Sequence, residues 1–107
     1  DTDADGVACC HIGLIYRLMG DYNRALLYHQ RHLMTAQRSG NLGAQGMAYS
    51  HMGNTYESLG HLQQALDCHK KALSIAEEAG DVAGQGDAYA NMGGVYDGLG
   101  DSHMSLQ

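Results

Sequence analysis

The sequence repeats itself at a spacing of 40 residues, and this repetition restricts the possible folds more than any other feature. Residues 1–40 and 41–80 align without a gap and share thirteen identities. Residues 41–67 and 81–107 share ten more. Self-similarity at one fixed spacing is typical of proteins built from stacked repeats, in which each unit buries its apolar surface against its neighbours. The sequence therefore predicts a solenoid.

Three units follow from this spacing: residues 1–40, residues 41–80 and residues 81–107. Small, aromatic and apolar residues recur at the same positions in all three. They are Gly6, Gly46 and Gly86; Ala8, Ala48 and Ala88; Gly13, Gly53 and Gly93; Tyr16, Tyr56 and Tyr96; Gly20, Gly60 and Gly100; and Leu26, Leu66 and Leu106. In this register the third unit is truncated shortly after the start of its second helix, which is expected near Asp101.

Each unit has the pattern of two helices joined at a glycine. In the first unit, apolar residues recur every three or four positions, so a helix is expected from about Thr2 to Leu18. Its apolar stripe consists of Ala8, Ile12, Ile15, Tyr16 and Met19. Gly20 should end this helix, because glycine adopts the left-handed conformation common at helix C-termini. Asp21 is then a favourable N-cap for the second helix.

Glycine also stands in the middle of the first helix of a unit, at Gly13 and Gly53. A glycine inside a helix costs about 1 kcal/mol relative to alanine. Its presence at the same register predicts that the two helices of a unit approach closely at this point. His29 and His69 also share one register, which predicts a packing role for each ring with one ring nitrogen hydrogen-bonded.

The repeat resembles the tetratricopeptide-repeat family over essentially the whole chain. The resemblance rests on the pattern Ala48-Tyr49-x-x-Met52-Gly53-x-x-Tyr56-x-x-Leu59-Gly60, followed by Ala65-Leu66-x-x-His69-x-x-Ala72-Leu73. It implies an all-α solenoid of antiparallel helix pairs wound into a right-handed superhelix. The chain departs from the family pattern in its histidines at an aromatic position, in lacking the late proline, and in a period of 40 rather than about 34 residues. Such long units are similar to those of Pins/LGN-type spindle-orientation adaptors and of large cytoskeletal or cell-division scaffolds.

The resemblance implies that the first helices of the units line a concave groove that binds protein or peptide segments. In the middle unit the groove-facing residues would be Met47, Ser50, His51, Asn54, Glu57 and Ser58, which share one helix face. The other units would add His11, Arg17, Asp87, Asn91 and Asp97. Asn54 is the first candidate, because an amide both donates to and accepts from a peptide backbone. Glu57, Asp87 and Asp97 predict a preference for basic or amphipathic partners.

Charge and hydropathy argue against several classes of partner. The chain has twelve acidic and six basic side chains, a formal charge of −6. This charge repels phosphate backbones, so nucleic acid is not an expected partner. No apolar run approaches the length of roughly 18 residues needed for a membrane span, and no leader pattern is visible. We therefore expect a cytoplasmic protein, and the resemblance suggests association with the cytoskeleton or spindle.

The sequence contains no pattern that indicates catalysis. The seven histidines and three cysteines form no set of four closely spaced ligands of the structural zinc type. No Ser or Cys stands in a pattern that indicates a nucleophile oriented beside a base. No phosphate-binding glycine loop occurs either. We therefore expect no enzyme activity, no metal and no cofactor.

Three functions remain open at this point. The first is an adaptor that binds peptides in the concave groove. The second is a structural spacer or self-assembly module, which would stack or self-associate through the apolar surface exposed at the ends of the array. The third is a sensor array that regulates an attached catalytic domain.

Overall fold

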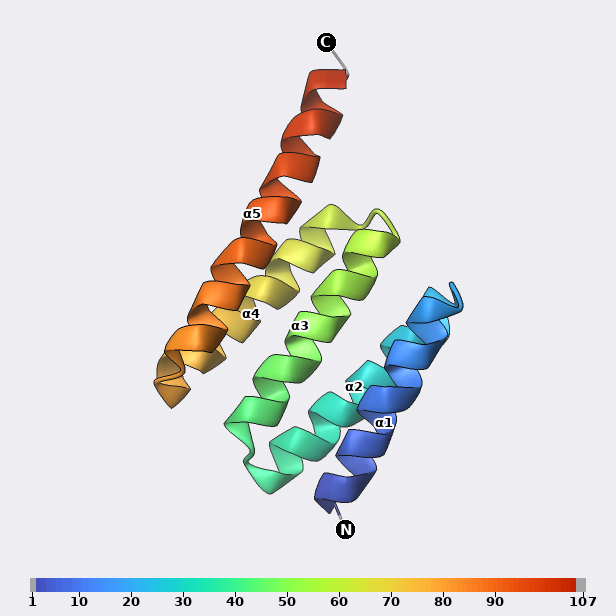
Figure 1. Ribbon diagram of the computed structural model, residues 1–107, viewed down its shortest axis with the longest axis vertical. Coiled ribbons are helices and arrows are strands. Elements are labelled where there is room, and N and C mark those ends of the chain that lie inside the picture. The colour runs from blue at the N-terminus through green and yellow to red at the C-terminus, as the bar shows by residue number, and fades with distance from the viewer. Residues whose placement is uncertain (1, 106–107) are drawn as a thin grey trace.

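The computed structural model describes the backbone of residues 2–105 and the side chains of residues 5–100. The described backbone forms five helices. They are α1 (Thr2–Leu18), α2 (Tyr22–Ser39), α3 (Leu42–Ser58), α4 (Leu62–Ala79) and α5 (Val82–Ser105). Figure 1 shows α1, α3 and α5 side by side in one layer, with α2 and α4 crossing behind them. The predicted all-α solenoid of antiparallel helix pairs is confirmed.

Glycines end the helices as the sequence predicts. Positive φ angles of 68 to 82° occur at Gly20, Gly40, Gly60 and Gly80, in the left-handed region that glycine adopts without strain. Asp21 caps α2 by accepting a hydrogen bond from the Arg24 backbone N–H at 3.2 Å. Asn41 caps α3 in the same way, with the Ala44 N–H at 3.0 Å. These side chains satisfy backbone donors that have no partner within the helix.

The two helices of a unit meet at the mid-helix glycines. A Cβ atom added to Gly13 would lie 2.6 Å from Cε1 of His29, and one added to Gly53 would lie 2.5 Å from Cε1 of His69. Both histidine side chains are fully buried. The predicted close approach and the predicted packing role of the two histidines are therefore confirmed.

The hydrogen bond predicted for these histidines is not formed. Within the described residues, neither ring nitrogen of His29 or of His69 has a hydrogen-bond partner. The rings face a helix whose backbone carbonyls already accept bonds from their own helix. Each imidazole therefore fills space as an aromatic ring would, and no described protein group accepts from or donates to its nitrogens.

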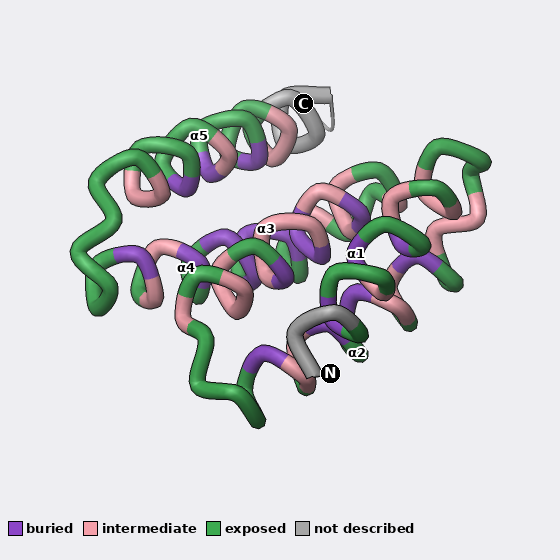
Figure 2. The backbone as a smooth tube through the Cα atoms, turned by 60° about the horizontal axis from the view of Figure 1, so that its bottom comes forward, coloured by how far each residue is buried: buried purple, intermediate pink, exposed green. Residues whose placement is uncertain are grey.

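The main apolar core lies between α4 and α5. Leu66 of α4 packs with Met92 and Val95 of α5, together with Ala65. Partly buried side chains surround this cluster, namely Tyr56, Leu62, Leu73 and Leu99. Figure 2 shows the buried residues on the facing sides of the helices and the exposed residues on the outer sides.

The apolar stripe of α1 is exposed, unlike the equivalent residues of α3 and α5. Ile12, Ile15 and Met19 are 37%, 55% and 72% exposed. Their equivalents 40 and 80 residues later are buried or half-buried, because α3 packs on α2 and α5 packs on α4. The stripe is thus the face on which the second helix of a preceding unit would pack. The described residues place no helix there.

The third unit differs from the prediction at Gly100. The backbone continues as one helix through Gly100 to Ser105, without a left-handed turn at this glycine. In the first two units, the residues after the turn pack back as α2 and α4. No second helix packs back after Gly100 in the described residues. The backbone there therefore continues the hydrogen bonds of α5 instead of turning. The helix start expected near Asp101 is therefore not a separate element here.

Candidate peptide-binding groove

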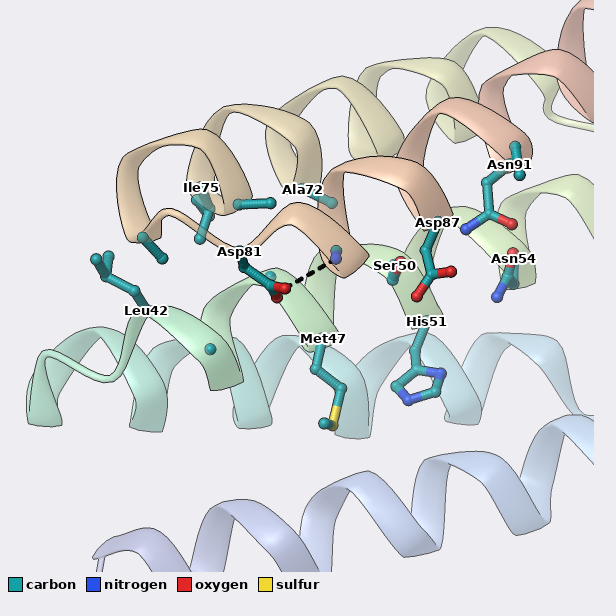
Figure 3. A pocket seen from close by; sticks show the side chains of 16 residues that line it. Leu42, Met47, Ser50, His51, Asn54, Ala72, Ile75, Asp81, Asp87 and Asn91 are labelled. Carbon is teal, nitrogen blue, oxygen red and sulfur yellow. Dashed lines mark hydrogen bonds between the residues drawn. The ribbon is translucent and has the colours of Figure 1, made fainter.

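A cavity of about 500 Å³ lies between α3 and α5, above α4. We call it the α3–α5 cavity (Figure 3). From α3 it is lined by Leu42, Met47, Ser50, His51 and Asn54; from α4 by Ala72, Ile75, Ala76 and Ala79; and from the start of α5 onwards by Asp81, Asp87, Ala90 and Asn91. Gly43, Gly46 and Gly84 complete the lining. The register of the repeat thus places the first helices of two units on opposite walls.

The cavity has an apolar part and a polar part. Leu42 and Ile75 lie near one end, close to the turn between α4 and α5 (Figure 3). At the other end, Asp87 and Asn91 from α5 point toward Ser50 and Asn54 from α3. A few converging polar groups beside an apolar floor are typical of sites that bind and orient a ligand.

Six of the eleven groove residues predicted from the sequence line this cavity. They are Met47, Ser50, His51, Asn54, Asp87 and Asn91, whereas Ser58, at the end of α3, does not line it. Glu57 lies farther along α3 and faces α5, since its Oε2 atom would be 3.9 Å from a Cβ atom at Gly94. His11, Arg17 and Asp97 are not part of the lining.

His51 lies at the boundary between the first two units, where it is close enough to Arg17 to be affected by its charge. The ring of His51 stacks on that of His29, with ring centroids 5.2 Å apart and planes at 19°. Burial lowers the pKa of His51, and the nearby charges of His32 and Arg17 lower it further. The lowered pKa favours the neutral imidazole, which forms part of the cavity wall while its ring packs on His29 of α2.

Asp81 is a functional candidate that the sequence analysis missed. It precedes α5, and its Oδ1 atom accepts a hydrogen bond from the Gly84 backbone N–H at 2.9 Å. A carboxylate at this end of a helix is stabilised by the helix dipole. Its position as the N-cap equivalent of Asn41 was readable from the repeat, but its place on the cavity rim depends on how α5 packs on α3.

The cavity carries negative charge. Asp81 and Asp87 are both exposed at its edge, and no lysine or arginine is among its lining residues. Lys71 of α4 is engaged elsewhere, with its Nζ atom 5.5 Å from the centre of the Tyr49 ring. A ligand with positive charge is therefore favoured over one with negative charge.

The cysteines and the other possible metal ligands within residues 5–100 are the remaining candidates for a site. Among the described residues, no group of three or more His, Cys, Asp or Glu side chains is arranged to hold a metal ion. Cys9, Cys10 and Cys68 are free, and burial raises the pKa of the Cys10 and Cys68 thiols. Buried thiols of this kind are poor nucleophiles. No helix in the described part of the chain has the length and apolarity to cross a membrane.

Comparison with known sequences decides the family. The tetratricopeptide-repeat profile matches residues 6–78 and, in a second alignment, residues 44–107. The chain belongs to the tetratricopeptide-repeat family. Tetratricopeptide repeats are generally protein-interaction modules rather than catalytic domains, and this chain is a tetratricopeptide-repeat scaffold in that general sense. No curated protein matches the sequence significantly.

Solved structures, two of them described as containing tetratricopeptide repeats, share the fold. The TPR domain of Arabidopsis FLU superposes with a TM-score of 0.88 at 19% identity, covering 94% of this chain and 85% of that chain. BtubC (BKLC) from P. vanneervenii gives 0.82 at 24% identity, covering 90% and 40%. A signal-transduction ATPase with a tetratricopeptide-repeat sensor, from Pyrococcus horikoshii, gives 0.78 at 25%, covering 90% and 15%. The chain thus spans less than half of the last two proteins.

Proposed function

We propose that this tetratricopeptide-repeat array is a scaffold that binds an extended or helical peptide segment of a partner protein in the α3–α5 cavity. The observation that carries the proposal is the cavity itself, with its volume of about 500 Å³ between the first helices of two units. Ligand sites in proteins commonly measure about 300–1,000 Å³ and combine apolar walls with a few polar groups. The α3–α5 cavity has both properties.

The residues around the cavity divide the task of recognition. Asn54 and Asn91 bind the peptide backbone, because each amide offers a donor and an acceptor. Ser50 adds a hydroxyl one helical turn before Asn54 on α3. Asp87 attracts basic side chains, and Glu57 and Asp97 extend the negative charge along the two walls. His11 and Arg17 contact the partner only where it extends past the cavity toward α1.

Binding to a partner in cell division or cytoskeletal organisation, in the cytoplasm, is the context that we propose for this scaffold. The support is the similarity of the 40-residue units to those of Pins/LGN-type adaptors and of large scaffold proteins. The acidic cavity favours partners with basic segments, and the formal charge of −6 disfavours nucleic acid.

A peptide-display selection tests the proposed site. The parent chain and an Asn54→Ala/Asn91→Ala variant are each exposed to a library of random 16-residue peptides on phage. Gln30→Ala/Gln64→Ala, which removes two exposed amides from α2 and α4, is the matched control. Peptides should be enriched on the parent and the control and lost on the cavity variant, once circular dichroism shows that all three are folded. Absence of enrichment on the parent would refute the proposal, and so would the same peptides on the cavity variant.

Self-association is a second candidate function, and it rests on a different surface. Ile12, Ile15 and Met19 expose an apolar stripe on α1 whose equivalents are covered elsewhere in the array. A second copy packing there would bury it. Light scattering at increasing concentration should show a dimer that Ile15→Glu converts to a monomer. A parent that stays monomeric at millimolar concentration contradicts this candidate.

A sensor array that regulates an attached domain is the third candidate. The similarity to the Pyrococcus horikoshii ATPase, whose tetratricopeptide repeats are described as a sensor, supports it. Limited proteolysis of the natural full-length protein, with and without the peptide enriched above, tests it. Protection outside the array on peptide binding is expected, and an unchanged pattern argues against the candidate.

A further inference from the structure

A second, much smaller cavity lies one repeat before the first. This α1–α3 cavity has a volume of about 70 Å³. Each residue that lines it stands 40 residues before a residue that lines the α3–α5 cavity. The smaller cavity therefore corresponds to one part of the larger cavity in the next unit, where different side chains stand on the same frame.

The residue that fills the smaller cavity is His32. Its side chain is almost fully buried, at 4% exposure, and its Cδ2 atom would be 3.2 Å from a Cβ atom on Gly6. The ring thus extends from α2 up to α1. The equivalent residue on α4 is Ala72, which lines the larger cavity. There a Cβ atom on Gly46 would meet only Ile75 Cγ2, at 3.6 Å.

Charge also differs between the two cavities. The N-cap residue at the rim is Asn41 in the smaller one and Asp81 in the larger one. Farther along, Asp87 stands where the preceding unit has Met47. The open cavity is thus the one with carboxylates, separated by six residues or about 9 Å along the helix.

We propose that the array recognises its partner only in the α3–α5 cavity. This cavity selects a peptide segment with a lysine or arginine next to an apolar side chain. The proposal rests on the peptide-binding function above and specifies its ligand. The apolar side chain occupies the space above Ala72 and Ile75. The basic side chain reaches Asp81 or Asp87 at the rim. In the preceding unit, His32 occupies the α1–α3 cavity and leaves no room there for such a side chain.

Two variants of the full chain test the two parts of this proposal. Ala72→His copies into α4 the histidine that α2 already accommodates, and Ser74→His places the same ring on the exposed side of α4 as its control. Asp81→Asn/Asp87→Asn removes both charges. Asn41 shows that asparagine caps a helix at this register, so the variant should keep its fold. Asp67→Asn/Glu78→Gln removes two exposed charges elsewhere.

The probe is the most enriched peptide from the random 16-residue library, synthesised with a fluorophore and followed by anisotropy. We expect lysine or arginine at one position of the enriched peptides, beside an apolar residue. Ala72→His should weaken binding at least tenfold. The double charge variant should weaken it at least threefold and flatten its dependence on salt concentration. Both controls should stay within twofold of the parent.

The outcomes separate this proposal from the function on which it rests. Enriched peptides without a basic residue would overturn the proposal that the ligand carries lysine or arginine. Full binding by a folded Ala72→His variant would overturn the proposal that binding occurs only in the α3–α5 cavity. Either result leaves peptide binding in place. If no peptide is enriched on the parent, both proposals fail. Should Ala72→His not fold, Ala72→Leu fills the same space without a polar ring and decides the question.

Discussion

The contact between α2 and α3 is made with histidine, whereas the contact between α4 and α5 is made with aliphatic side chains. At the first contact, His29 stacks on His51. At the second, Leu66 packs on Met92 and Val95. Both contacts use the same 40-residue frame, and the helices run in the same order. The backbone of a repeat is thus independent of what fills the space between units, and the filling decides pH sensitivity and cavity size.

Acid should weaken the α2–α3 contact, and this is the largest effect that we predict. Burial, with the nearby His51, His32 and Arg17, lowers the pKa of His29 from 6.5 to about 4. Between these pH values the unfolded chain therefore binds more protons than the folded chain. The stability contributed by neutral His29 is complete above pH 6.5 and falls as the pH decreases to about 4, by about 3 kcal/mol. Burial also lowers the pKa of His32, so His32 adds a further loss of folding stability as the pH falls.

Urea unfolding at pH values between 7 and 4 measures this loss. His29→Phe should reduce the dependence on pH, while His61→Gln, which changes an exposed histidine, should not. Hydrogen exchange should show α1 and α2 opening at a higher pH than α4 and α5, although His69 also has a lowered pKa. Equal loss of protection in α1 and α2 and in α4 and α5 would show that acid does not weaken the α2–α3 contact more than the α4–α5 contact.

Leu66→Ala should break the α4–α5 contact at a cost of about 2–3 kcal/mol, because it removes a side chain that is 4% exposed from the main core. The same change at Leu26, which is half-buried, should cost about half as much. Thermal and urea unfolding of the two variants provide the comparison. Equal costs would mean that the two contacts are equally well packed, contrary to their burial.

Glycine substitutions distinguish α3, which packs against the second helix of its unit, from α5, which has no such partner among the described residues. Gly53→Ala places a methyl group 2.5 Å from the His69 ring, and such overpacking costs about 1–2 kcal/mol. Gly93 has the same register, but a Cβ atom there meets nothing within 4 Å. Gly93→Ala should therefore stabilise the chain by up to about 1 kcal/mol through helix propensity. Urea unfolding should show a lower free energy of unfolding for Gly53→Ala and a higher one for Gly93→Ala. A destabilising Gly93→Ala would contradict this account.

Repetition made the backbone predictable from the sequence. Gly20 and Asp21 define the end of one helix and the start of the next by local chemistry alone. Gly13 predicted the close approach within a unit, and His29 predicted a packing role, because each recurs at its register in the second unit. Local rules of this kind need no knowledge of the neighbouring helix.

The site was less predictable, because it depends on side chains that differ between units. The change from His32 to Ala72 is one substitution among many in the alignment, and its effect on volume appears only when α1 or α3 is placed above it. The spacing of His51 puts it on the groove face of α3, yet its ring turns to His29. The end of α5 failed as a prediction for a related reason, since Gly100 forms a turn only if a second helix packs back.

Two substitutions should convert the closed α1–α3 cavity into an open one. His32→Ala removes the ring that fills the α1–α3 cavity, and Asn41→Asp gives its rim the carboxylate that Asp81 provides in the next unit. Because Met47 stands where the later unit has Asp87, the new level should bind the enriched peptide more weakly than the natural level. Isothermal titration should therefore show a second, weaker site in this variant and a single site in the parent. One site in both would mean that cavity volume and rim charge do not suffice, and that the orientation of His51 also closes this level.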